Sequence, residues 1–209
     1  MEKGEFTAYC VVPAEKIIQD LSQLDRLKEF HEAFLKANKE KNYKLCEDIA
    51  WYPGLTGSSA ITITSSNVIL DFDNHYLTQA NSASFQATGG FNGVKINANV
   101  NDVTIIANEG GISNIAGWGI NFVGPHDKIK LEGLTVKGCG SNARIGAFGP
   151  FVNSVTVDGG VQVGTRETST VLTTVSNLLM SNLRLLTNKN IGLSVNTNKN
   201  IILEDSLID

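Results

Sequence analysis

A short apolar alternation returns along most of this chain, and it constrains the fold more than any other feature. Six segments begin with an apolar residue, at intervals of 35, 26, 26, 23 and 23 residues. The residue two positions later is again apolar in all six, which is the pattern of a β-strand with one face turned inward. These starting residues, called anchors below, are Val68, Val103, Ile129, Val155, Leu178 and Ile201.

Each repeat contains more than one strand. Beyond the anchored strand and a turn, another short strand follows, as at Leu134–Val136 and Leu183–Leu185. Strands this short bury an apolar face only when successive repeats stack in parallel. We therefore predict an all-β parallel β-helix, a solenoid of about six coils. The alternative is an antiparallel β-sandwich, which does not explain why the same inward pattern returns. A further alternation precedes the anchors, at Ile61 and Ile63, Val94 and Ile96, Ile120 and Phe122, Val171 and Val175, and Ile191 and Leu193.

Asparagine or aspartate comes one or two residues before each anchor. Both residues tolerate the left-handed backbone of a tight turn, and stacked side chains of this kind can hydrogen-bond from coil to coil. We predict a structural role for this set, which comprises Asn67, Asp102, Asp127, Asn153, Asn177 and Asn200.

The first 50 residues have a different composition, rich in charge and poor in glycine. Apolar residues such as Ile17, Leu21 and Leu24 recur three or four apart, which predicts an amphipathic helix. The sequence thus divides into an N-terminal helical segment or cap over 1–50 and the β-helix over 51–209. The segment covers one end of the solenoid, or it binds a partner.

Composition excludes several classes of function. The formal net charge of −4 offers no basic surplus for nucleic acid, and no apolar run is long enough to span a membrane. The scattered cysteines Cys10, Cys46 and Cys139 lack zinc-ligand spacing, and they do not suggest a disulfide framework. No signal peptide is seen, which favours an intracellular or virion-associated protein.

Two stretches make the chain resemble a known superfamily. "NYKLCEDI", with Tyr43 and Asp48, precedes "AITITSSNVILDFDNHYLTQ", with Asp71 and His75. Together they are similar to the opening of right-handed parallel β-helix repeat proteins of the pectin-lyase-like superfamily. The resemblance covers about 43–209 and implies a right-handed β-helix. It implies no single function, because the superfamily contains pectate lyases, polygalacturonases, tailspikes and non-catalytic members.

The enzymatic motifs of that superfamily are not found. The chain has "NTN" at 196–198, but no Asp-Asp pair, no Gly-His-Gly and no Arg-Ile-Lys. The candidate catalytic residues are Glu132 and Asp158, the third residues after their anchors. On successive coils their carboxyl groups would lie about 5 Å apart, as an acid and nucleophile pair or a cation site. The alternative is a solvated acidic edge that Lys130 neutralises.

We expect a non-catalytic scaffold, or an adhesive or carbohydrate-binding protein, which includes structural components of virions and surfaces. The alternative is a polysaccharide lyase or glycoside hydrolase. The candidate ligand-binding residues are Trp118, which would stack on a sugar ring if exposed, and Arg144. We expect no cofactor and no metal, and Ca²⁺ only in the enzymatic alternative. The expected partner is a polysaccharide or other glycan, with neither nucleic acid nor a membrane span.

The chain ends inside a repeat, at Asp209. An uncapped solenoid end would expose apolar core and unpaired strand edges. We expect that the chain is a fragment, incomplete at the C-terminal end, or that self-association or a partner covers this end.

Overall fold

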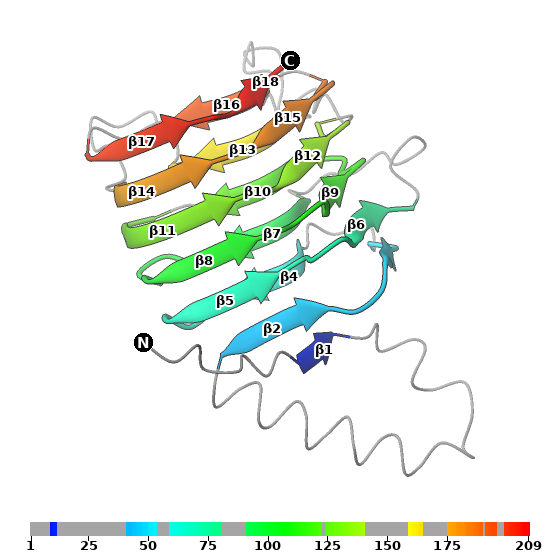
Figure 1. Ribbon diagram of the computed structural model, residues 1–209, viewed down its shortest axis with the longest axis horizontal. Coiled ribbons are helices and arrows are strands. Elements are labelled where there is room, and N and C mark those ends of the chain that lie inside the picture. Colours follow the sequence, from blue (N-terminus) through cyan, green and yellow to red (C-terminus); the bar gives the residue numbers. More distant parts are fainter. Residues whose placement is uncertain are drawn as a thin grey trace, which may run out of the picture.

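The computed structural model of the chain describes residues 9–11, 41–53, 59–80, 91–122, 124–140, 159–164, 175–189, 191–195 and 199–209. Its strands form three sheets in which every pair of neighbours is parallel, stacked as in Figure 1. We name them sheet A, with seven strands, sheet B, with six, and sheet C, with five.

The strands are numbered along the chain. Sheet A contains β1 (Tyr9–Val11), β2 (Asn42–Leu45), β5 (Val68–Asp71), β8 (Val103–Ile106), β11 (His126–Glu132), β14 (Val175–Ser181) and β17 (Ile201–Glu204). Sheet B contains β3 (Ile49–Trp51), β6 (Tyr76–Gln79), β9 (Gly111–Ser113), β12 (Thr135–Lys137), β15 (Arg184–Leu186) and β18 (Leu207–Ile208). Sheet C contains β4 (Ser59–Ile63), β7 (Asn92–Ile96), β10 (Trp118–Phe122), β13 (Gly159–Val163) and β16 (Ile191–Val195).

From β2 onward the chain visits sheets A, B and C in turn, and each visit adds one strand to each sheet. Such stacking is consistent with a parallel β-helix, so the predicted all-β solenoid is confirmed at this level. Five coils are complete, and the sixth contributes β17 and β18. The antiparallel sandwich is excluded for the described strands because their pairs are parallel.

One apolar core runs along the inside of the three sheets. Side chains two residues after the anchors lie in it, for example Ile105 and Leu131, both fully buried. Each large aliphatic side chain buried in this way contributes about 1.5–3 kcal/mol. At the last coil the same position is Leu203, which is 44% exposed because no further coil covers it in the structure.

The repeat alignment was wrong at one coil. It placed a coil anchored at Val155 between those of Ile129 and Leu178, but β11 pairs directly with β14. The strand that this coil adds to sheet C is β13, whose "GGVQV" lies within the segment aligned on Val155, and Val175 belongs to sheet A rather than to sheet C. One coil therefore spans about 49 residues from Ile129 to Leu178, and long connections on both sides of β13 disguise the repeat.

A column of glycines follows sheet C. The strand register places Ala60, Gly93, Gly119, Gly160 and Gly192 side by side on successive coils. A Cβ atom on Gly119 would lie 2.5 Å from Cγ1 of Val136 and 2.8 Å from the carbonyl oxygen of Gly160. The absence of side chains thus lets sheet B pack closely against sheet C.

Most of the predicted N-terminal helical segment lies outside the described residues. Within 1–50 the structure describes β1, which pairs in parallel with β2 in sheet A, and the start of β3 in sheet B. Cys46 is disulfide-bonded, whereas Cys139 is free and buried. The disulfide at Cys46 runs against the sequence interpretation, which expected none because the three cysteines are odd in number and widely scattered.

Candidate functional site

A polar column runs along the outer face of sheet C. The residues in it alternate with inward apolar residues, so their side chains point away from the core. The register aligns one such residue from each of the five strands, about 4.8 Å apart from coil to coil. This sheet C column consists of Thr62, Lys95, Asn121, Gln162 and Ser194. Thr62 is exposed and the other four are half-buried.

The middle of the sheet C column is tied to its neighbours by amide hydrogen bonds. Nδ2 of Asn121 donates to Oδ1 of Asn92 at 2.9 Å, and Nδ2 of Asn92 donates to Oγ of Ser59 at 3.2 Å. The Oδ1 atom of Asn121 is buried and has no hydrogen-bond partner among the described residues. The Asn121 amide therefore anchors the column to the protein and is not itself open to a ligand.

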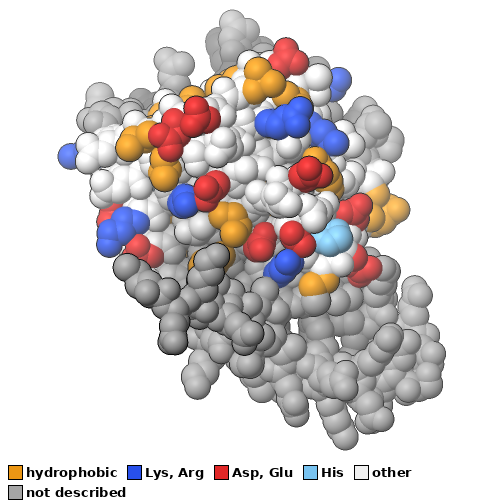
Figure 2. All heavy atoms as spheres, viewed as in Figure 1, with side chains coloured by type: hydrophobic (Ala, Val, Ile, Leu, Met, Phe, Trp, Pro, Cys, Tyr) orange, Lys and Arg blue, Asp and Glu red, His pale blue; other side chains and the backbone are white. Residues whose placement is uncertain are grey.

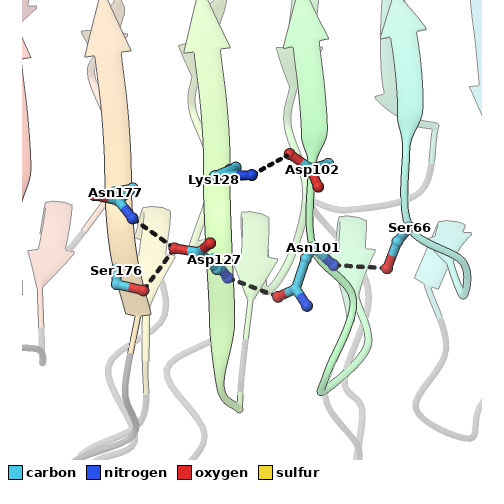
Figure 3. Close-up of polar contacts among 7 residues, drawn as sticks. All are labelled: Ser66, Asn101, Asp102, Asp127, Lys128, Ser176 and Asn177. Carbon is cyan, nitrogen blue, oxygen red and sulfur yellow. Dashed lines mark hydrogen bonds and ion pairs between the residues drawn. The ribbon is translucent and has the colours of Figure 1, made fainter.

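A second polar column follows the turns that lead from sheet C to sheet A (Figure 3). The backbone N–H of Asn101 donates to Oγ of Ser66 at 3.0 Å, and the N–H of Asp127 donates to Oδ1 of Asn101 at 2.7 Å. Oδ1 of Asp127 accepts hydrogen bonds from Ser176 at 2.8 Å and Asn177 at 2.7 Å. These bonds lower the pKa of Asp127, to which the nearby Lys128 also contributes.

The predicted structural role of the turn residues is confirmed where they are described. Asn67, Asp102 and Asn177 have left-handed backbones, with φ of 61°, 53° and 51°. Nδ2 of Asn200 continues the stack by donating to Oδ1 of Asn177 at 3.3 Å. Their side chains serve the turns, which makes them poor candidates for ligand contact. Asn153 lies outside the described residues.

Charges of both signs are interspersed on the face of sheet A (Figure 2). Lys44 pairs with Asp73 at 3.0 Å, and Asp48 lies 3.5 Å from Nδ1 of His75. Asp48 also accepts the backbone N–H of Tyr76 at 2.9 Å. Such pairing fits a structural role for His75.

Of the candidate acid pair, Glu132 lies among the described residues and Asp158 does not, so the pairing stays a prediction. Glu132 pairs with Lys130 at 2.7 Å, as the solvated-edge alternative predicts. Its neighbours in sheet A are Ile106 and Ser181, and Asp158 lies outside the described residues. Among the described residues no group of acids, histidines or cysteines could hold a metal ion.

The candidate ligand-binding residues are placed as follows. Trp118 begins β10 and is 5% exposed, so little of its ring is open to a sugar. Arg144 falls in the connection between β12 and β13 and lies outside the described residues. His126 is buried at the start of β11, where Nδ1 lies 2.8 Å from the carbonyl oxygen of Val100.

Cys139 is not a reactive thiol. It is fully buried, and burial raises the pKa of its thiol to about 12. The thiolate is the nucleophilic form, so this side chain is inert near neutral pH.

The sheet C column was missed by the sequence interpretation, although a signal for it exists. In each coil one polar residue stands between two inward apolar residues: "ITI", "VKI", "INF", "VQV" and "LSV". Both apolar residues of "ITI", "VKI" and "INF" and the Leu193 of "LSV" were assigned to strands, but the polar residue between them was not considered. The fifth, "VQV", was not recognised, because Val171 and Val175 were taken as the strand in its place.

No family model, curated protein or solved structure matches this chain. No helix long and apolar enough for a membrane span occurs in the described part of the chain.

Proposed function

We propose that this protein is a non-catalytic scaffold that binds carbohydrate along the outer face of sheet C. The sheet C column carries the proposal. It places polar side chains at a regular spacing on five successive coils, and polar groups of this kind complement the hydroxyls of a glycan chain. Lys95 is its one charged member, which suits a neutral or mildly acidic polysaccharide.

Two observations favour binding over catalysis. Glu132 is neutralised by Lys130, and Asp127, whose pKa is lowered, uses its carboxylate to hold turn residues together. A general acid needs the opposite shift, with a pKa raised toward the working pH. We further propose that the chain is a right-handed β-helix of the pectin-lyase-like superfamily. The stacked sheets support this proposal, together with the motif at Tyr43 and Asp48.

The proposal is tested by measuring binding to a panel of neutral and acidic polysaccharides by glycan array and calorimetry. Gln162→Ala removes one member of the sheet C column, and the loss of one hydrogen bond, about 1 kcal/mol, should weaken binding about fivefold. Thr104→Ala is the matched control, because Thr104 lies on the outer face of sheet A. Equal effects of the two variants, or no binding to any polysaccharide, would contradict the proposal.

The same samples distinguish binding without cleavage from the enzymatic alternative. Mass spectrometry of the incubated polysaccharides, with and without Ca²⁺, would show fragments with an unsaturated end for a lyase. Fragments that have gained water would indicate a hydrolase. Intact polysaccharide is the expected result.

A further inference from the structure

The last strand of each sheet forms an open end of the solenoid. β16, β17 and β18 stand at the ends of sheets C, A and B, and Figure 1 shows them together at one end. All three strands expose large apolar side chains in this end, namely Val195 (40%), Ile202 (55%), Leu203 (44%), Leu207 (53%) and Ile208 (47%). An edge of this kind is a template for another strand.

The sequence of β17 and its flanks is complementary to itself in the antiparallel sense. "KNIILED", from Lys199 to Asp205, has a base at one end, acids at the other and apolar residues between. Two residues directly opposite in a strand pair must face the same side of the sheet. If Ile202 lies opposite its own copy, inward Ile201 lies opposite inward Leu203, and Lys199 lies opposite Asp205.

Other registers that keep inward residues opposite inward residues are worse. Shifting the pairing by two residues in one direction places outward Glu204 opposite apolar Ile202. The opposite shift pairs Lys199 with Leu203. The register centred on Ile202 alone matches apolar with apolar and base with acid, at both ends of the pair.

The same two-fold axis, normal to sheet A, brings the other two edges together. This axis places the open edge of sheet A against the same edge of the other copy. It also places the open edge of sheet B against the open edge of sheet C in the other copy. β18 then faces β16 of the second copy, so Leu207 and Ile208 lie near the exposed Val195 of the other copy. All three open edges are thus covered in a single closed contact.

We propose that the open end docks on a second copy of this chain, through antiparallel pairing of β17 with itself. The contact buries the inward Val195, Leu203 and Ile208, brings the outward Ile202 against its own copy, and leaves the outer face of sheet C free. Carbohydrate binding is therefore independent of it, and either proposal can fail alone.

The first experiment measures the mass of the 209-residue protein in solution by light scattering over a dilution series. We expect a dimer, and we expect Lys199→Asp or Asp205→Lys to weaken association because like charges then face each other. The double variant should restore it. Asp205 has a left-handed backbone, as do Lys41 and Lys128, so the fold tolerates lysine in this conformation. A monomeric protein, or a double variant weaker than both single variants, would overturn the proposal.

A cross-link tests the register directly. With Ile202 opposite its copy, the two Cα atoms are about 4.5–5.5 Å apart, within the range that a disulfide spans. Ile202→Cys should form a covalent dimer under mild oxidation. Leu179→Cys is the control, since Leu179 lies beside Ile202 in the adjacent strand and is about three strand spacings, roughly 14 Å, from its copy. Cross-linking of the control alone, or of neither variant, would rule out this register.

Discussion

At the scale of single residues, Asp127 joins two coils through one carboxylate. Its pKa is lowered by hydrogen bonds from Ser176 and Asn177 and by Lys128. A lowered pKa means that the ionised form stabilises the fold above the unfolded pKa, near 4, and that this stabilisation is lost as pH falls through the folded pKa. The hydrogen bonds that Asp127 makes in the second polar column should therefore weaken in acid.

The variant Asp127→Asn keeps the shape of the side chain and removes the charge. We expect the melting temperature of the variant to be below that of the native protein at pH 7, and the difference to shrink toward pH 2.5, as the native carboxylate begins to take up a proton. Ser176→Ala, which removes the donor with the largest effect, should reduce the pH dependence only in part. The measurement is thermal unfolding at both pH values, and an unchanged difference would speak against this role.

At the scale of elements, the strands were more predictable than their faces. Inward residues such as Val94 and Ile120 were assigned correctly because burial imposes an apolar residue at every second position. Gln162 and Asn121 were missed because an outward position carries no such constraint. The coil that contains β13 was misplaced for a different reason, since its long connections break the periodicity on which the alignment depended.

The glycine column should tolerate an added methyl group better at some positions than at others. At Gly119 an added methyl group meets Val136 and the carbonyl oxygen of Gly160, neither of which can move freely. Overpacking of this kind costs about 1–3 kcal/mol. At Gly192 the nearest atom is Cγ2 of Ile208, at 2.7 Å on a half-exposed side chain that is able to turn away.

We therefore expect Gly119→Ala to lower the free energy of unfolding by about 1–3 kcal/mol and Gly192→Ala by less. Urea denaturation with an unchanged slope would measure both variants on the same scale. A larger loss at Gly192 than at Gly119 would show that the close approach of sheets B and C is not what excludes larger residues from the column.

At the scale of the whole molecule, the open end could be anticipated because the apolar pattern continues to the last coil. What the sequence alone could not show is which side chains are exposed there, since this depends on how the three sheets end. The exposed set includes inward Leu203 and outward Ile202. The self-complementary charge pattern around Ile202 indicates pairing with a second copy only once β17 is known to be an edge strand.

A solenoid of this kind should lose stability unevenly, because each coil contacts only its neighbours. Ile105 is fully buried between two coils, so Ile105→Ala should cost about 2–5 kcal/mol. Leu203 is 44% exposed and has a neighbour on one side only, so Leu203→Ala should cost clearly less in dilute, dissociated protein. At concentrations where the end is covered by a second copy, the Leu203→Ala variant should lose additional stability relative to native protein, whereas the loss in Ile105→Ala should not depend on concentration. Denaturation at two protein concentrations separates these effects, and equal costs for the two variants at dilution would argue against a core that weakens toward its open end.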